Sequence, residues 1–370
     1  MCRVIHVTST HSAMDTRIFW RECRSLSKAG YEVYIVAHDV PSEACEGVQF
    51  VDLPPQFTRR ALLTRPDRAA GFFAKLNGDV YHFHDPDLLP VAGLMGRKEQ
   101  IVIYDCHEWY YESFPYKGYP QIITKVVRLG YRLVERNTIH NLSAIITPSE
   151  ELATVYKDRA KLVVPLRNFA PIDLFTGGIP DRERQEYDLI HVGVLSRPRL
   201  SFMLDVIREV HRRGRQLTLL LLGVSLELRA WIDEQSDVAA YVTSLDRVPV
   251  DQVPTIMHSA RIGLNYHPYQ TRLMVAIPIK VFEYMGCGLP FVSSALPPLK
   301  SILGDKGAGI LVESNEIEAF ADAILALLDN RQLRAKMGKR GRECVEQMYN
   351  WEAESAKLVE LYEMLLCRTR

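Results

Sequence analysis

Long apolar runs are missing from this chain. The longest, residues 217–224, is far shorter than the ~20 residues that a membrane-spanning helix needs. The opening residues, 1–7, have the pattern of a short strand and contain no extended apolar segment of the kind found in a signal peptide. The sequence therefore predicts a cytoplasmic protein, and any association with the inner face of the cell membrane would be peripheral.

An excess of charge of either sign is missing as well. The 370 residues include 45 basic and 45 acidic side chains, so nothing global points to nucleic acid as a partner. The seven cysteines are scattered, odd in number, and include no Cys-x-x-Cys pair. A disulfide framework and a structural zinc site are therefore not expected, whereas a reducing compartment is.

What is present is a repeated alternation of strands and helices. Residues 3–9 read as a buried strand, 18–28 as a helix and 32–37 as the next strand, which makes a βαβ unit with a parallel sheet. After a polar stretch at 168–185, which we interpret as a linker, the alternation restarts. Two such series predict an α/β protein with two doubly wound, Rossmann-like domains facing across a cleft. The predicted segments are an N-terminal domain at 1–170, a C-terminal domain at 171–350 and a last helix at 351–370.

Residues 265–298 carry the strongest functional signal. A strand end is followed by a polar loop and by a short helix that opens near Pro278, with Ile279 and Lys280 in its first turn. Free N–H groups and the positive dipole end of such a helix form a ready site for an anion. Glu283 follows within an apolar run, where a carboxylate needs hydrogen-bond donors, and a ribose diol supplies two. The stretch therefore predicts a site for a nucleoside diphosphate.

A basic loop follows the first strand of the second series. Arg197 and Arg199 come directly after that strand and Gly193, and guanidinium groups bind phosphate oxygens bidentately. The same residues also suit an ordinary solvated loop, and their spacing alone leaves both interpretations open. Because Lys280 adds a third cation, we predict that this loop clamps a diphosphate.

Polar residues also follow the strands of the first half. We predict that an acceptor is bound by side chains from three of these loops, namely His11, Asp15, Arg17, His84, Asp85 and Glu108. His107, beside Glu108, suits a general base, a partner for a sugar hydroxyl or a packed loop residue. Asp85 and Asp87 form an Asp-x-Asp that can hold a metal–diphosphate pair. Because the cations of the second half can neutralise the diphosphate, we predict no metal site.

One helix of the first half has a basic stripe. Lys125, Arg128, Arg132 and Arg136 are spaced three, four and four residues apart, and Ile122, Val126, Leu129 and Leu133 can form an apolar stripe beside them. An aromatic-rich loop at 109–119 precedes the helix. This pattern suits an anionic membrane surface, and it suits equally an ordinary surface helix whose apolar side packs on the core.

Together these stretches resemble a bacterial family-4 glycosyltransferase of the two-domain GT-B fold. The resemblance covers nearly the whole chain and rests on six segments in order: Ser-Thr-His…Asp-Thr-Arg-Ile-Phe, His-Asp-Pro-Asp-Leu-Leu-Pro, Tyr-Asp-Cys-His-Glu, Ile-Ile-Thr-Pro-Ser-Glu, Pro-Ile-Lys-Val-Phe-Glu-Tyr-Met-Gly-Cys-Gly-Leu-Pro and Tyr-Asn-Trp. It implies a donor of UDP-sugar or GDP-sugar type in the second domain, with Glu283 on the ribose and Arg199 on the phosphates. It also implies that His107 lies near the reacting sugar and that the last helix crosses back to the first domain. Enzymes of this kind retain anomeric configuration and need no metal or cofactor.

Two positions depart from the family pattern. Val275 stands where a first glutamate is usual, and Val194 stands where an arginine usually follows the glycine. Lys280 is expected to take over part of the diphosphate charge. We therefore predict a retaining, metal-independent hexosyltransferase in polysaccharide or cell-envelope glycan assembly, with a glycan or lipid-linked acceptor. The alternatives are a non-catalytic nucleotide-sugar-binding protein, which Val275 favours, and a nucleotide-sugar epimerase on the same fold.

Overall fold

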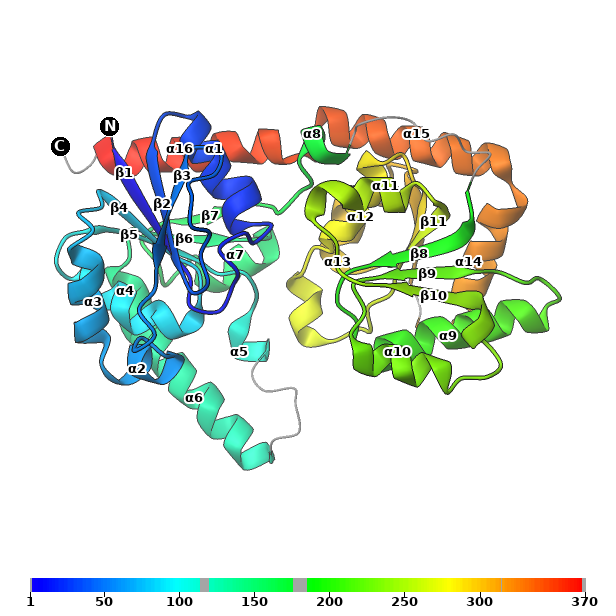
Figure 1. Cartoon of the computed structure of the whole chain (residues 1–370), viewed down its shortest axis with the longest axis horizontal. Helices are drawn as coiled ribbons and strands as arrows, with labels where there is room; N and C mark the ends of the chain where they lie inside the picture. Colours follow the sequence, from blue (N-terminus) through cyan, green and yellow to red (C-terminus); the bar gives the residue numbers. More distant parts are fainter. Residues whose placement is uncertain (1, 114–119, 176–184, 314, 368–370) are drawn as a thin grey trace. The chain divides into compact units, whose positions relative to one another are not determined.

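The structure is a computed structural model that describes residues 2–113, 120–175, 185–313 and 315–367 (Figure 1). The chain divides into two compact units, Met1–Asn168 with Ala353–Arg370, and Phe169–Glu352. Each unit contains a single all-parallel sheet whose strand order reverses direction once, between β1 and β4 in the first unit and between β8 and β11 in the second. The prediction of two doubly wound, Rossmann-like domains is confirmed.

The first unit is built on a seven-stranded sheet with the order β3-β2-β1-β4-β5-β6-β7. Its strands are β1 (Arg3–Val7), β2 (Glu32–Ala37), β3 (Val48–Asp52), β4 (Val80–Phe83), β5 (Ile101–Asp105), β6 (Ala144–Thr147) and β7 (Val163–Pro165). The central strands are buried and mainly apolar, as expected for a parallel sheet covered on both faces, and they also contain His6, His82 and Asp105.

The helices of the first unit fill the crossovers between these strands. They are the π-helix η1 (Ile18–Cys23), α1 (Arg24–Lys28), α2 (Arg59–Thr64), α3 (Pro66–Ala74), η2 (Pro86–Leu88), α4 (Leu89–Gly96), α5 (Tyr110–Ser113), α6 (Gln121–Thr138), η3 (Ile139–Asn141) and α7 (Glu150–Tyr156). The last helix, α16 (Trp351–Cys367), adds its residues from Ala353 onward to this unit. Tyr362 of α16 lies in the core, where its hydroxyl is 2.7 Å from Nδ1 of His82.

The second unit has a six-stranded sheet with the order β10-β9-β8-β11-β12-β13. The strands are β8 (Tyr187–Val192), β9 (Leu219–Leu222), β10 (Val242–Leu245), β11 (Ala260–Asn265), β12 (Phe291–Ser294) and β13 (Gly309–Val312). The helices are α8 (Ile172–Phe175), α9 (Arg197–Arg212), α10 (Leu226–Asp233), η5 (Ala239–Tyr241), η6 (Val250–Gln252), α11 (Val253–Met257), η7 (Thr271–Val275), α12 (Ile279–Gly286), α13 (Pro297–Leu303), α14 (Ile317–Asp329) and α15 (Arg331–Gln347).

The interpretation of residues 168–185 as a linker is wrong for its first part. Phe169 and Phe175 are buried in the core of the second unit, and the Phe169 ring lies 4.5 Å from that of Phe282. Two large apolar side chains favour burial over a solvated connection. Residues 176–184 of the interpreted linker lie outside the described part of the chain.

Candidate functional site

The carboxyl edge of the second sheet brings together several predicted donor-binding residues. Gly193 follows β8 at the point where the strand order reverses, and its φ of 97° is accessible to glycine at little cost. A Cβ built at Gly193 would lie 3.8 Å from Nζ of Lys280. The glycine therefore leaves space directly beside the ammonium group, at the edge of the sheet where ligands of doubly wound folds bind.

Helix α12 is held against this edge by Tyr284. The Tyr284 hydroxyl donates to the carbonyl oxygen of Ile190 at 3.2 Å and accepts from the N–H of Val192 at 3.3 Å. Its ring occupies the space above Gly263, where a Cβ would be only 2.4 Å from a ring carbon. This packing fixes the start of α12, with Lys280 in its first turn, next to the end of β8.

Pro278 is the N-cap of α12, one position before the first helical residue. The sequence placed the helix opening near Pro278, and the structure starts the helix at Ile279. The Pro278 carbonyl accepts from the N–H of Val281 at 3.2 Å, and the Pro278 side chain makes no capping hydrogen bond. The first turn consequently presents backbone N–H groups beside the Lys280 side chain.

Lys280 and Arg199 form a pair of like charges. Burial and the neighbouring Arg199 lower the pKa of Lys280 to about 7, against a smaller opposing effect of Glu283. Within the described part of the chain, no carboxylate lies within ion-pair distance of the Lys280 ammonium. The same two cations act on His191. Burial, Lys280 and Arg199 lower the pKa of His191 well below its usual range. A positive site of this kind favours an anionic ligand.

Arg199 is anchored by the loop that follows β11. Its Nε donates to the carbonyl oxygen of Tyr266 at 2.9 Å, and Nη2 lies 3.3 Å from Nε2 of His267. Arg197 is more exposed, and its guanidinium stacks 4.8 Å from the ring centroid of Trp231 on α10. Arg199 is close enough to Lys280 for its charge to act on that residue, whereas Arg197 contacts a neighbouring helix.

Glu283 lies one turn after Lys280 on α12 and is partly exposed. Its side chain is thus accessible at the surface of the second unit, while its neighbours Phe282 and Tyr284 are fully buried. A partly exposed carboxylate next to a lysine is chemically suited to accept hydrogen bonds from a diol. Its role in binding ribose stays a prediction.

Arg247, which was not among the predicted donor residues, also lies at this edge. A Cβ on Gly223, whose φ is 86°, would lie 3.5 Å from Cγ of Arg247 and 3.8 Å from Cα of Gly193. Arg247 is exposed and follows β10 by two residues, so its position after a strand was a signal in the sequence. Only the adjacency of β8, β9 and β10 brings it close to Gly193.

In the first unit, Asp85 organises the loop after β1. Its carboxylate accepts from the Thr8 hydroxyl at 2.6 Å, the Ser9 N–H at 2.7 Å and the Thr10 hydroxyl, and lies 2.9 Å from Nδ1 of His11. Burial alone would raise the pKa of Asp85, but His11 and these hydroxyls hold it well below the usual range. Asp85 is predicted to bind an acceptor, and the structure shows its oxygens holding the loop instead.

The Asp-x-Asp motif is explained by the same loop. Asp87 accepts from the Ser9 hydroxyl at 2.8 Å and is buried, so both aspartates of the motif face residues after β1. Arg59 lies 3.8 Å from the Asp87 carboxylate. The two side chains therefore stabilise the fold of the loop after β1.

Asp105, at the end of β5, is the second organising carboxylate. It accepts two hydrogen bonds from Arg17, at 2.6 and 2.8 Å, and lies 3.4 Å from Nδ1 of His84 and 3.2 Å from Nε2 of His107. Burial opposes its charge, but Arg17 and His107 keep the pKa of Asp105 well below the usual range. Arg17 and His84 are both buried. The contacts predicted between these two residues and an acceptor would therefore involve side chains that the fold encloses.

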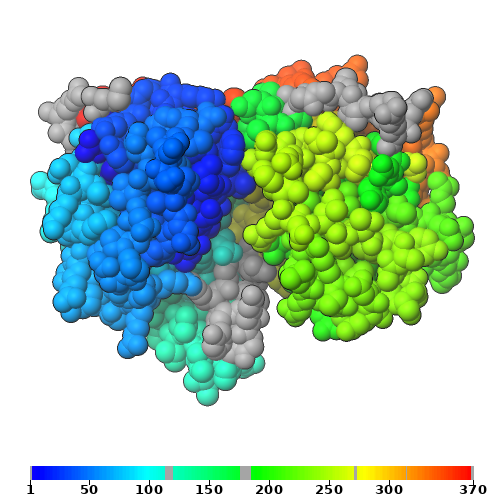
Figure 2. All heavy atoms as spheres, viewed as in Figure 1, coloured from blue at the N-terminus to red at the C-terminus, as the bar shows by residue number. Residues whose placement is uncertain are grey.

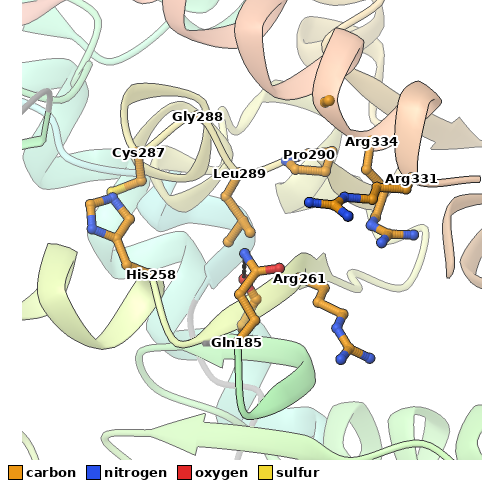
Figure 3. A pocket seen from close by; sticks show the side chains of 11 residues that line it. Gln185, His258, Arg261, Cys287, Gly288, Leu289, Pro290, Arg331 and Arg334 are labelled. Carbon is orange, nitrogen blue, oxygen red and sulfur yellow. Dashed lines mark hydrogen bonds between the residues drawn. The ribbon is translucent and has the colours of Figure 1, made fainter. Parts of the chain in front are cut away.

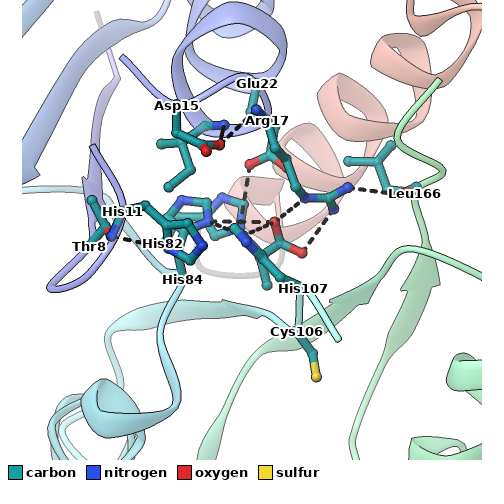
Figure 4. Close-up of polar contacts among 12 residues, drawn as sticks. Thr8, His11, Asp15, Arg17, Glu22, His82, His84, Cys106, His107 and Leu166 are labelled. Carbon is teal, nitrogen blue, oxygen red and sulfur yellow. Dashed lines mark hydrogen bonds and ion pairs between the residues drawn. The ribbon is translucent and has the colours of Figure 1, made fainter. Parts of the chain in front are cut away.

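The accessible members of the predicted acceptor site are fewer. His11, Asp15 and His107 are partly exposed, and Glu108 is exposed. The rings of His11 and His107 lie 4.7 Å apart, so loops from β1 and β5 bring two imidazoles together at one place (Figure 4). Asp105 was not among the predicted site residues, although its position at the end of a buried strand was a usable signal.

A cavity at the opposite edge of the second sheet contains no predicted donor residue (Figure 3). It is lined by residues that precede or begin the strands, among them Gln185, Arg261 and Pro290, together with Arg331 and Arg334. Arg261 is paired with Asp188, and Arg334 donates to two carbonyl oxygens of α14. The cavity lies at the amino ends of the strands, away from the edge where such folds bind nucleotides.

Two family models match successive parts of the chain. "Glycosyltransferase Family 4" matches residues 16–165, and "Glycosyl transferases group 1" matches residues 186–330. A phosphatidyl-myo-inositol mannosyltransferase from Mycolicibacterium smegmatis is 22% identical over 353 residues, which cover 91% of this chain and 86% of that protein. An O-antigen chain mannosyltransferase B from Escherichia coli is 25% identical over 144 residues, covering 37% of this chain and 36% of that protein.

Solved structures share the architecture. A sucrose-phosphate synthase from Thermosynechococcus elongatus superposes with a TM-score of 0.76 at 17% identity, covering 100% of both chains. HepE from Anabaena, solved in complex with UDP-glucose, gives a TM-score of 0.70 at 13% identity, covering 98% of this chain and 100% of that one. At these identities the likeness establishes the fold, which is of the GT-B type.

Proposed function

We propose that this chain, which a family 4 model and a group 1 glycosyltransferase model match in succession, is a retaining hexosyltransferase that uses a UDP-sugar or GDP-sugar. The observation that carries the proposal is the pair Lys280 and Arg199 at the carboxyl edge of the second sheet, with space beside Gly193. Two neighbouring cations, of which Lys280 has no carboxylate partner among the described residues, suit a ligand that brings its own negative charge.

In the proposed complex the second unit holds the donor. The diphosphate lies against Lys280, Arg199 and the N–H groups of the first turn of α12, whose N-cap residue makes no side-chain capping hydrogen bond. Glu283, one helical turn further along, accepts hydrogen bonds from the two ribose hydroxyls. Arg247 is close enough to Gly193 to add a further positive charge.

In the proposed reaction, the main role of this positive site is to stabilise the leaving group. The bond between the anomeric carbon and the phosphate oxygen breaks, and negative charge grows on the leaving diphosphate. The acceptor oxygen forms the new bond to the same carbon, and its proton passes to the leaving phosphate. Preorganised cations and N–H groups stabilise the growing charge, since they need no reorganisation during the reaction.

We assign acceptor binding to the first unit. His11, Asp15, His107 and Glu108 are at least partly exposed there, and Asp105 and Asp85 position the two histidines. The named relatives include a mannosyltransferase for phosphatidyl-myo-inositol and one for O-antigen chains. On this basis the proposed acceptor is a glycan or a lipid-linked glycan of the cell envelope.

Val275 favours a second candidate, a nucleotide-sugar-binding protein without transferase activity. A thermal-shift panel of UDP, GDP, ADP and their sugars, followed by NMR of the donor with glycan acceptors, tests both. We expect one nucleotide series to raise the melting temperature, because a ligand of the native state stabilises it. We then expect the new linkage to keep the anomeric configuration of the donor. Binding without turnover would favour the second candidate, and no binding would contradict both.

Helix α6 supports a membrane contact of the first unit. Its predicted apolar stripe, Ile122, Val126, Leu129 and Leu133, is 52–76% exposed, so the alternative that this stripe packs on the core is wrong. The helix forms part of the molecular surface (Figure 2, blue-green). Lys125 and Arg136 are exposed beside the stripe, and Arg128 and Arg132 lie near the Tyr111 ring. None of the described helices combines the length and the apolar character of a membrane span.

We therefore propose that α6 lies on an anionic membrane, and flotation with phosphatidylglycerol vesicles tests this. Each basic residue near such a surface contributes about 1 kcal/mol. The double variant Lys125→Glu/Arg136→Glu is expected to lose flotation at low salt. Lys157→Glu/Lys161→Glu makes the same charge change elsewhere on the first unit and is expected to float. The absence of flotation by the unmodified protein would remove the proposal.

A further inference from the structure

Four buried side chains of the first unit converge on one point. His6 of β1 and His82 of β4 are direct partners in the parallel register, and His84 follows His82 by two residues and faces the same way. Glu22 comes from the π-helix η1, a rare geometry that is frequent at functional sites. All four side chains are fully buried. They are here called the histidine–glutamate cluster (Figure 4).

The polar atoms of this cluster are incompletely satisfied. Within the described part of the chain, both carboxylate oxygens of Glu22 lack a hydrogen-bond partner. The same is true of the Nε2 atom of His82. Oε1 of Glu22 lies 3.1 Å from Nε of Arg17, an ion pair without hydrogen-bond alignment. Oε2 lies 3.9 Å from both Nδ1 of His6 and Nε2 of His82. A buried carboxylate in such surroundings is costly unless a cation or a proton neutralises it.

The spacing of the cluster suits a metal ion. One ligand atom from each of the four side chains lies within 4.8 Å of every other. Nδ1 of His6 is 2.9 Å from Nε2 of His84, and the Glu22 distances are 3.9 Å. A tetrahedral zinc ion, with bonds of about 2.0–2.1 Å, separates its ligand atoms by about 3.3–3.4 Å. These three distances bracket that value and the remaining ones are at most 4.8 Å, so side-chain shifts would complete the site.

The second nitrogen of each histidine already has an orienting partner. Nδ1 of His84 lies 3.4 Å from the Asp105 carboxylate, and Nδ1 of His82 lies 2.7 Å from the Tyr362 hydroxyl. The same hydroxyl lies 3.4 Å from Nε2 of His6. Metal-binding histidines characteristically use their other ring nitrogen in this way, which fixes the tautomer and the ring orientation.

We propose that the histidine–glutamate cluster binds one zinc ion. Three imidazoles and one carboxylate match the ligands and coordination number of zinc in proteins. Because every ligand is fully buried, no coordination position is open to substrate, and the ion is structural. It joins β1, β4 and η1 within the first unit. The proposal is independent of the donor site and assigns His84 to the metal rather than to an acceptor.

The overlapping group His84, Asp105 and His107 is less suited to a metal. Asp105 already accepts two hydrogen bonds from Arg17, which neutralises its charge. Glu22 differs, because its carboxylate lacks aligned donors. The expectation of no structural zinc site rested on the absence of cysteine pairs. That criterion does not detect a set of histidines that come together from distant positions in the sequence.

The test is the metal content of the full-length chain without a polyhistidine tag, grown with added zinc and dialysed. We expect about one zinc per chain by mass spectrometry and a fall in melting temperature of at least about 5 °C after treatment with a strong chelator, reversed by zinc. Glu22→Gln keeps the shape of the side chain and is expected to reduce bound zinc at least about fivefold. His140→Gln, an exposed histidine of the same unit, is the matched control.

Two results would overturn the proposal. One is an unmodified protein with less than about 0.1 zinc per chain and a melting temperature that neither chelator nor zinc changes. In that case a proton on Glu22 neutralises the cluster. The other is a folded Glu22→Gln variant that binds as much zinc as His140→Gln. Should Glu22→Gln fail to fold, the metal content and chelator response of the unmodified protein still decide.

Discussion

Replacing Lys280 by methionine is expected to lower the turnover number for sugar transfer about 10²- to 10³-fold, the usual effect of removing one donor from developing negative charge. Methionine preserves length and apolar contacts, so the loss isolates the charge. The measurement is the initial rate of transfer at saturating donor. Lys336→Met removes a lysine from an exposed position on α15 and is expected to leave the rate unchanged. Equal rates for Lys280→Met and the unmodified protein would contradict the proposed donor site.

The pKa of Lys280 gives this prediction a second readout. A group with a pKa of about 7 is charged below pH 7 and neutral above it, so at higher pH donor binding must take up a proton. The affinity for a nucleoside diphosphate sugar, whose phosphates do not titrate here, is expected to fall about tenfold per unit above pH 7. Lys280→Arg stays charged and is expected to remove this dependence. A pH-independent affinity of the unmodified protein would contradict the assignment.

Replacing Glu283 by alanine is expected to weaken nucleoside diphosphate binding about 30- to 150-fold, since a lost charged hydrogen-bond pair costs about 2–3 kcal/mol. Calorimetry with the nucleoside diphosphate measures this effect directly. Glu283→Gln keeps one acceptor oxygen and is expected to lie between alanine and glutamate. Because Glu283 is partly exposed, neither variant is expected to unfold the second unit.

The control for Glu283 is Glu318→Ala, which removes an exposed carboxylate from α14. A 2′,3′-dideoxyribose nucleotide provides a further comparison, because it lacks the hydroxyls that Glu283 is proposed to bind. The unmodified protein is expected to discriminate against this analogue, and Glu283→Ala is expected to bind both nucleotides with similar affinity. Unchanged affinity of Glu283→Ala for the normal nucleotide would contradict the proposal that Glu283 binds the ribose.

Much of the architecture could be predicted because its signals are local. The alternation of apolar strands with helices, the glycine after β8 and the proline before α12 all act within a few residues. The candidate donor residues could be selected for the same reason, since they follow a strand, open a helix or, in the case of Glu283, interrupt an apolar run. The boundary at Phe169 could not, because burial of that ring depends on Phe282, far away in the sequence.

Local patterns are enough to identify the two series of βαβ units and the polar loops that end their strands. Which of those loops meet depends on how the strands are ordered in the folded sheets. No local segment specifies the order of strands in a parallel sheet. That order places His6 beside His82, Arg247 beside Gly193 and Asp105 beside Arg17. The tertiary structure also determines that the apolar stripe of α6 faces outward, since burial is a property of the assembled fold and not of helical periodicity.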